Sequence, residues 1–155
     1  MATDTESVIK DSFAAGNSHD IDKVISFFTN DCVYEDVAIG RVNRGKEELK
    51  AFFKEMFVWS PDAKIELKSV FSAGDWAASE WVMTGTHAGD TPELPATGKS
   101  FSVRGTSIIQ MRNGKLSRQS DYWNLMSFLQ QVGLIPSTQP NWFGRLMMRL
   151  LMKRS

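Results

Sequence analysis

Residues 101–123, FSVRGTSIIQMRNGKLSRQSDYW, contain the pattern that decides the fold. The dipeptide Asn113-Gly114 is a strong signal for a tight hairpin turn, because both residues accept the positive φ angles that such a turn requires. The residues on either side, 101–112 and 115–123, are therefore predicted to form two long antiparallel strands.

The sheet is predicted to begin further upstream. After residue 61 the apolar period changes from 3.6 to 2, as the alternation within residues 64–68 indicates. Residues 74–75 predict a hairpin turn into a strand over 76–87. Residues 88–99 contain two glycines and two prolines. They predict a long connection at the rim of a pocket, where it could act as a lid.

The first sixty residues instead show helical spacing. We expect helices over residues 3–16 and 21–28, a strand over 32–39, and a third helix that follows a loop at 41–45 and ends at Ser60. Helices followed by successive hairpins indicate an α+β domain. The expected architecture is a curved antiparallel sheet wrapped over the N-terminal helices, forming a cone with an internal pocket.

The composition is that of one globular domain. The chain has 155 residues, of which 42% are hydrophobic and 23% are charged, as expected for a single core. Its one cysteine, Cys32, cannot form an intramolecular disulfide, and residues 1–10 contain no apolar run, so we expect a cytoplasmic protein. Neither a nucleotide-binding fingerprint nor metal-ligand spacing is present, so no cofactor is expected.

Two groups of motifs resemble known families. The segment Tyr34-Glu35-Asp36, with Gly45 nine residues after the aspartate, resembles the ketosteroid isomerases. Five further segments resemble the SnoaL-like polyketide cyclases: residues 85–89, 94–99, 104–105, 114–116 and 130–136. The resemblance implies the cone-shaped fold and an intramolecular aldol cyclisation that needs neither metal nor nucleotide.

The resemblance also implies three catalytic residues. Asp36 stands where the isomerases have their proton-shuttling base. Asp121 lies on the last strand, where the cyclases use an acidic side chain with the help of a histidine, for which His87 is the candidate. The chain departs from the isomerase pattern at a later strand, where Thr106 or Ser107 replaces a second acid.

Physical chemistry leaves two interpretations of Asp36. Inside an apolar pocket its pKa would be raised, and the carboxylate would be an effective base near neutral pH. At the end of a strand it could instead cap the following loop or form an ion pair with Arg41 or Arg44.

Asp121 has a similar pair of interpretations. It shares its strand face with Gln119 and Trp123, so it would enter the same pocket and form an acid and base pair with a second carboxyl group. Alternatively, it could form an ion pair at the sheet edge with Arg118 or Arg104.

The expected ligand is an apolar small molecule. Aromatic side chains at inward positions would shape its cavity, although such residues more often fill a core. The candidate ligand contacts are Tyr34, Trp59, Trp81, Arg104, Trp123 and Asn124, of which Asn124 stands where many cyclases carry an aspartate. His87 has the strand parity of Trp81 and would relay a proton at the pocket rim.

Residues 137–155 are predicted to form a C-terminal tail beyond a cone domain of residues 1–136. The tail is amphipathic, with one apolar and one basic helical face: Trp142, Phe143, Leu146, Met147, Leu150 and Leu151 against Arg145, Arg149 and Lys153. It could bind an anionic membrane or close the cone, or it could pack on its own sheet or on a partner subunit. We expect a homodimer, and no nucleic-acid partner because the rest of the chain is acidic.

Two functions are consistent with these observations. The first is an enzyme, a cyclase or isomerase, that moves a proton at a carbon next to a carbonyl, with Asp121 and Asp36 exchanging protons and His87 or Tyr34 stabilising the enolate. The second is a non-catalytic module of the same fold that binds a hydrophobic ligand or mediates dimerisation.

Overall fold

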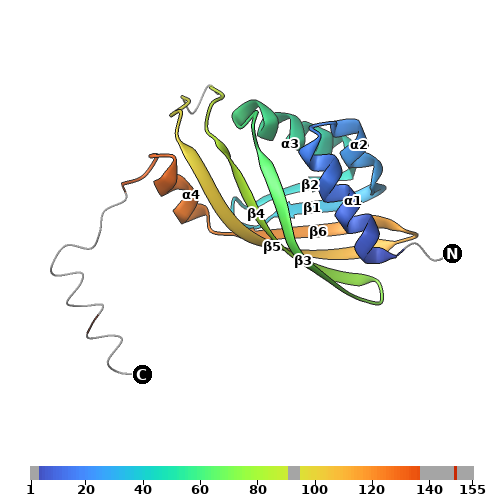
Figure 1. The fold of residues 1–155 in the computed structure, drawn as a ribbon. Coiled ribbons are helices and arrows are strands. Elements are labelled where there is room, and N and C mark those ends of the chain that lie inside the picture. Colours follow the sequence, from blue (N-terminus) through green and yellow to red (C-terminus); the bar gives the residue numbers. More distant parts are fainter. Residues whose placement is uncertain (1–3, 91–94, 137–148, 150–155) are drawn as a thin grey trace.

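The computed structural model describes residues 4–90, 95–136 and Arg149 (Figure 1). In chain order its elements are α1 (Thr5–Asn17), α2 (Ile21–Ser26), β1 (Phe28–Asp36), β2 (Arg41–Arg44), α3 (Gly45–Trp59), β3 (Lys64–Ala73), β4 (Trp76–Thr86), β5 (Ser100–Arg112), β6 (Lys115–Trp123) and α4 (Leu125–Gln131). Residues 91–94 of the predicted lid, and all of the predicted tail except Arg149, lie outside the described residues.

The strands form one six-stranded sheet in the order β2-β1-β6-β5-β4-β3. From β3 to β6, consecutive strands pair antiparallel, as the turn signals predicted. β1 is antiparallel to β2 but parallel to β6, so the sheet is mixed and not antiparallel throughout. A parallel pair needs a long connection, which the chain provides because β2 to β5 lie between these two strands in the sequence.

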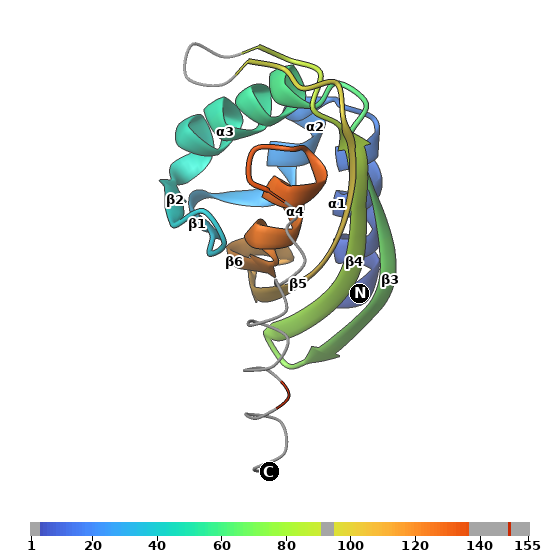
Figure 2. The same cartoon turned by 90° about the vertical axis from the view of Figure 1, so that its left-hand side faces the viewer.

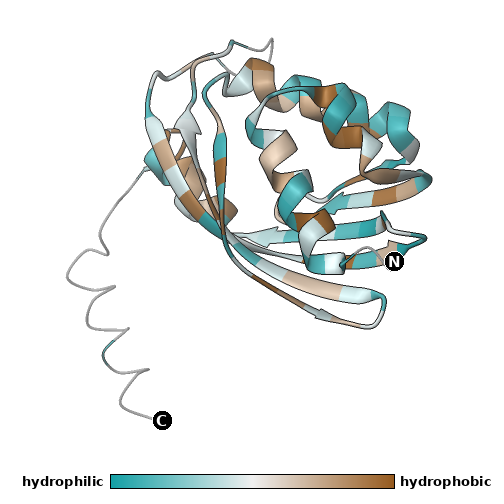
Figure 3. Ribbon diagram, turned by 45° about the vertical axis from the view of Figure 1, so that its right-hand side comes forward, coloured by the Kyte–Doolittle hydropathy of each residue, from teal (hydrophilic) through white to brown (hydrophobic). Residues whose placement is uncertain are grey.

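The helices cover the concave face of the sheet. In Figure 2 the sheet curves around α1, α2 and α3, and α4 lies in front, at one end of the cone. Figure 3 shows hydrophobic residues recurring at intervals along the helices and strands, which is the patterning that places one face of each element inward. The predicted α+β cone is confirmed.

The strand expected over residues 32–39 spans Phe28–Asp36 instead, and two neighbouring segments also differ from the sequence prediction. The second helix was expected to reach residue 28, but it ends at Ser26, and Phe28 begins β1 by pairing with Leu116. The loop expected at residues 41–45 is largely strand β2, which pairs with Val33–Asp36. In both segments, pairing with a strand outweighs the local preference.

The core between helices and sheet has two parts. In the first, the fully buried side chains of Ile9 and Leu49 pack with Ile109 and Leu116 of the sheet. Burial of each such side chain stabilises the fold by about 1.5–3 kcal/mol. The second part lies under α4 and is largely aromatic: Trp81, Phe101, Val103, Phe128 and Val132. No helix of the described residues is long and apolar enough to cross a bilayer.

Candidate active site

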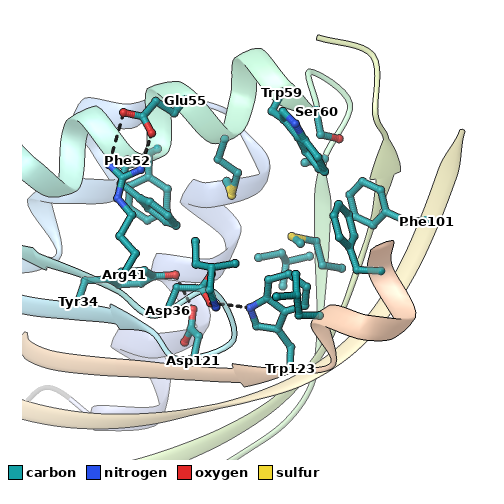
Figure 4. A pocket seen from close by; sticks show the side chains of 18 of the residues that line it. Tyr34, Asp36, Arg41, Phe52, Glu55, Trp59, Ser60, Phe101, Asp121 and Trp123 are labelled. Carbon is teal, nitrogen blue, oxygen red and sulfur yellow. Dashed lines mark hydrogen bonds and ion pairs between the residues drawn. The ribbon is translucent and has the colours of Figure 1, made fainter. Parts of the chain in front are cut away.

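A cavity of about 660 Å³ lies between α3, the concave face of the sheet and α4 (Figure 4). Its volume is typical of sites for drug-sized ligands, about 300–1,000 Å³. Most of its lining is apolar: Ile39, Phe52, Phe53, Met56, Val58, Trp59, Ala63, Ile65, Trp81, Met83, Phe101, Trp123, Leu125 and Phe128. Polar and charged residues also reach the wall: Tyr34, Asp36 and Asp121 meet at one end, and Arg41, Lys54, Glu55 and Ser60 line the wall as well.

The parallel pairing of β1 and β6 places the two acids side by side. Asp36 and Asp121 are partners in the strand register, and the Val37 amide donates to the Asp121 carbonyl at 3.0 Å. Because side chains alternate along a strand, Tyr34 and Trp123 lie on the same face as the acids. All four therefore reach the cavity, from the two strands whose pairing the sequence did not predict.

Asp121 is buried, and three donors hold its carboxylate. The Tyr34 hydroxyl donates to Oδ2 at 2.5 Å, while the Ser107 hydroxyl and the Gln119 amide donate to Oδ1 at 2.6 and 2.9 Å. Ser107 in turn accepts from the Trp81 indole at 2.9 Å. Burial raises the pKa of Asp121, and the nearby Asp36 charge acts in the same direction, whereas the three hydrogen bonds oppose the rise.

Asp36 has a freer carboxylate. Its Oδ1 accepts from the Trp123 indole at 2.9 Å and from the Ile39 amide at 3.3 Å. Within the described residues, Oδ2 has no hydrogen-bond partner. Burial raises the pKa of Asp36, and its hydrogen bonds only partly oppose this. One oxygen of this side chain is thus available to a ligand.

Neither acid forms the ion pairs considered from sequence. Asp36 does cap the loop through Ile39, but Arg41 pairs with Glu55 of α3. The two arginines considered as partners of Asp121 bind other acids on the sheet, with Arg118 at Glu35 and Arg104 at Glu80.

The other end of the cavity is aromatic. The Trp59 and Phe128 ring centroids are 4.9 Å apart, and Phe128 stands edge-on to Phe101 at 5.0 Å and to Trp123 at 5.6 Å. Four of the predicted ligand contacts line the cavity, namely Tyr34, Trp59, Trp81 and Trp123. An apolar, flat ligand group fits this end best.

Three predicted site residues lie elsewhere. His87 is fully buried behind Trp59, with ring centroids 4.2 Å apart, and is not part of the cavity wall; burial lowers its pKa. Arg104 is exposed and pairs with Glu80. The Asn124 side chain accepts from the Ser127 amide at 2.9 Å and caps α4.

Several polar residues in the wall, or bonded to residues of the wall, were not predicted from the sequence. Ser107 was noted only as a replacement for a second acid, and its contact with Asp121 was not foreseen, although its inward strand parity was readable. Arg41 and Glu55 also line the cavity, where the Arg41 guanidinium lies 5.0 Å from the Phe52 ring centroid. Among the described residues, no three His, Cys, Asp or Glu side chains are grouped to hold a metal ion.

Comparison with known sequences gives consistent matches. Residues 7–132 match the family model for SnoaL-like polyketide cyclases. Cyclase aurE of Calcarisporium arbuscula is 31% identical over 110 residues, which cover 70% of this chain and 78% of that protein. The aklanonic acid methyl ester cyclase DnrD of Streptomyces peucetius is 26% identical over 86 residues, covering 56% of this chain and 59% of that cyclase.

Solved structures show the same fold at low sequence identity. AclR of Streptomyces galilaeus has a TM-score of 0.78 at 21% identity, covering 96% of this chain and 92% of that one. A protein of Catenulispora acidiphila with a ketosteroid isomerase-like fold has a TM-score of 0.73 at 23% identity, covering 86% and 97%. The predicted ketosteroid isomerase-like fold is confirmed.

Proposed function

The chain belongs to the SnoaL-like polyketide cyclase family, and on this basis we propose that it cyclises an apolar polyketide-like substrate by cofactor-free acid and base catalysis. The observation that supports this proposal is the pair of buried carboxyl groups, Asp36 and Asp121, in the wall of a mostly apolar cavity. Two neighbouring acids in such a setting do not ionise alike, so one can accept a proton while the other holds one.

Asp36 is the proposed base. Its Oδ2 is the carboxylate oxygen without a partner in the described part of the chain, whereas Trp123 and Ile39 fix the other oxygen. A base must come within hydrogen-bond reach of the proton it removes. A raised pKa brings its basicity closer to that of a general base working near neutral pH.

The pair of Tyr34 and Asp121 is the proposed acid. Tyr34 lines the cavity and is bonded to Asp121. When Asp121 carries the proton, it can donate to the Tyr34 oxygen, which frees the Tyr34 hydroxyl hydrogen for a substrate oxygen. Burial and the nearby carboxylates hold the pKa of Tyr34 well above its usual range, so this hydroxyl stays protonated.

The proposed reaction is an internal aldol addition. Asp36 removes a proton from a carbon next to a carbonyl. The C–H electron pair forms the C=C bond of an enolate, and the π pair of the carbonyl moves to its oxygen, which Tyr34 stabilises. The enolate carbon then forms a bond to a second carbonyl carbon of the same molecule. The oxygen of that carbonyl takes the proton back from Asp36, so the product is an isomer of the substrate and both side chains return to their initial states.

The test measures proton abstraction directly. The probe is 2-tetralone, a flat bicyclic ketone whose C1 protons are acidic, and NMR follows their replacement by deuterium in D2O. The native chain should accelerate the exchange, and Asp36→Asn should reduce the acceleration about 100-fold or more, as should Asp121→Asn. Glu35→Gln is the matched control, because Glu35 adjoins Asp36 but is bonded to Arg118 and Ser120 instead.

Two outcomes would contradict the proposal. Exchange at the native rate in folded Asp36→Asn would exclude Asp36 as the base. Binding of the probe, seen as quenched tryptophan fluorescence, without any acceleration would favour the hypothesis of a non-catalytic binding module.

Homodimerisation and a cytoplasmic location stay predictions.

A further inference from the structure

A second polar group of the cavity wall adjoins the proposed base. Arg41 and Asp36 are partners in the antiparallel register of β1 and β2, and both line the cavity. Residues directly opposite each other in such a pair have Cβ atoms about 4.5–5.5 Å apart and point to the same side of the sheet. Arg41 therefore borders the space in which a substrate would meet Asp36.

The Arg41 guanidinium is held on several sides. Its Nε donates to the Asn43 Oδ1 at 3.1 Å, and both of its terminal nitrogens donate to the Glu55 carboxylate on α3 (Figure 4). The same group lies 5.0 Å from the centroid of the Phe52 ring. A guanidinium fixed by these contacts is already oriented for a ligand, so binding does not have to order it.

Arg41 keeps donors that these contacts do not use. A guanidinium has five N–H groups, of which the Nε and one on each terminal nitrogen are engaged. Within the described residues, the second N–H of each terminal nitrogen has no partner. Because Arg41 lines the cavity, these donors are available to a ligand oxygen in it.

Asn43 supports Arg41 from behind the wall. It is 2% exposed and is not part of the cavity lining. Since arginine only donates, Asn43 must turn its oxygen toward Arg41, and its Nδ2 is left buried with no partner in the described part of the chain. An unpaired buried donor destabilises a fold, so a polar residue at this position indicates a role in orienting Arg41.

The charges around Arg41 indicate which kind of oxygen it would bind. Hydrogen bonds from Arg41 hold the pKa of Glu55 below its ordinary value, so Glu55 is ionised and balances the guanidinium charge. A carboxylate ligand would then be repelled by both Glu55 and Asp36. A neutral carbonyl oxygen accepts from the guanidinium without this repulsion.

We propose that Arg41 binds a second carbonyl oxygen of the substrate, so that the reacting carbon lies between two carbonyls and the substrate is a 1,3-dicarbonyl compound. This inference rests on the proposed function, in which Tyr34 binds the first carbonyl oxygen and Asp36 removes the proton. A carbon between two carbonyls is more acidic than a carbon next to one, because both oxygens share the enolate charge. Arg41 stabilises the share on its own oxygen, which makes a carboxylate base sufficient.

The experiment is isothermal titration calorimetry with three unreactive naphthalenes. The ketone 3-acetyl-2-naphthol copies the enol of a 1,3-dicarbonyl compound, 2-naphthol lacks the second oxygen, and 3-hydroxy-2-naphthoate replaces the ketone with a carboxylate. The native chain should bind the ketone at least about tenfold more tightly than 2-naphthol, as expected for a hydrogen bond to a charged donor. It should also bind the ketone more tightly than the naphthoate.

Variants of the arginine and its support test the assignment. Arg41→Met keeps an apolar stem over Phe52 but removes the donors, so it should weaken ketone binding about tenfold and change 2-naphthol binding by less than about twofold. Asn43→Leu preserves the side-chain size and should reduce the preference for the ketone about threefold, because Arg41 loses one of its fixed contacts. Comparing two probes within one variant separates this positioning role from a general loss of folded protein.

Two further variants are controls. Arg118→Met removes an arginine that pairs with Glu35 and does not line the cavity, so the preference for the ketone should stay native. Lys54→Met removes the other cation of the wall. Its ammonium forms no hydrogen bond or ion pair within residues 4–90 and 95–136 that would fix its position, and the preference should again stay native.

The proposal is overturned if the native chain does not prefer the ketone to 2-naphthol or binds the naphthoate more tightly than the ketone. It is also overturned if Arg41→Met keeps the native preference, or if Lys54→Met abolishes it. Binding of these probes does not depend on turnover. A preference for the ketone without any proton exchange would contradict the proposed reaction alone, whereas exchange without the preference would contradict only the role of Arg41.

Discussion

The two ends of the cavity have opposite energetics. At the carboxylate end, Asp36 and Asp121 are buried, and burial raises both pKa values because it disfavours the charged forms. At the aromatic end, Trp59, Phe101 and Phe128 lose contact with water and gain each other, which favours folding. This molecule therefore places its proposed reactive groups at one end of the cavity and its stabilising aromatic groups at the other.

The largest expected effect comes from removing a ring of the aromatic end. Phe101 is 4% exposed and packs against Trp59 and Phe128. Phe101→Ala should lower the free energy of unfolding by about 3–5 kcal/mol, because it removes a large apolar group and leaves a void. Urea denaturation measures the loss.

Phe71→Ala is the control for that change. Phe71 is also a strand phenylalanine, but it is 67% exposed, so its truncation should change the free energy of unfolding by less than about 0.5 kcal/mol. Equal losses from the two variants would mean that the aromatic end does not stabilise the fold in the way described.

The sequence predicted which residues form the carboxylate end better than it predicted the contacts between them. Strand alternation with the turn at Asn113-Gly114 was sufficient to define β6 at residues 115–123 and to place Asp121 with Trp123. The partners of Asp121 were harder to predict, because Tyr34 reaches it through a parallel pair of strands far apart in the chain. No local pattern encodes such a pairing.

The misplaced site residues have local explanations. His87 points inward like Trp81 and is fully buried, but the Trp59 ring stacks on it and lies between it and the cavity. Arg104 lies between the inward residues Val103 and Gly105 and therefore faces outward. Asn124 follows the last residue of β6, where the chain turns into α4 and needs a capping side chain. The family resemblance suggested roles for these residues, but their positions are determined by local packing, by strand parity and by the point at which a strand ends.

An intermediate effect is expected where the two ends meet. A Cβ atom at Gly105 would lie 2.3 Å from the ring of Trp81, whose indole is bonded to Ser107 and, through it, to Asp121. Gly105→Ala should therefore displace this buried ring and lower the free energy of unfolding by about 1–3 kcal/mol, measured in urea.

Gly16→Ala is the matched control for the crowding at Gly105. A Cβ atom there meets nothing within 4 Å, and Gly16 is part of α1. Alanine should stabilise the helix by about 0.5–1 kcal/mol. If Gly105→Ala proved as stable as the native chain, the close packing of Trp81 on the sheet would be refuted. The hydrogen-bonded chain from Trp81 through Ser107 to Asp121 would then not be held in place by this packing.

The smallest expected effect is on the pH dependence of stability, which should have opposite signs for two kinds of carboxyl group. A carboxyl group with a raised pKa binds its proton more tightly in the folded chain than in the unfolded chain. Its contribution to stability is therefore fully present below the unfolded pKa, about 4. This contribution is lost as the pH rises through the pKa of the folded chain. Asp36 and Asp121 are of this kind. Relative to Asp36→Asn and Asp121→Asn, the native chain should therefore lose stability as pH rises above about 4.

Asp62 supplies the opposite case. It accepts hydrogen bonds from the Thr86 hydroxyl and amide, both at 2.8 Å, and these hold its pKa below the ordinary value. Relative to Asp62→Asn, the native chain should therefore lose stability as pH falls. Urea denaturation of the four proteins over a pH series measures both slopes. Slopes of the same sign would mean that burial does not dominate at the carboxylate end, and that these acids are ordinary paired carboxylates.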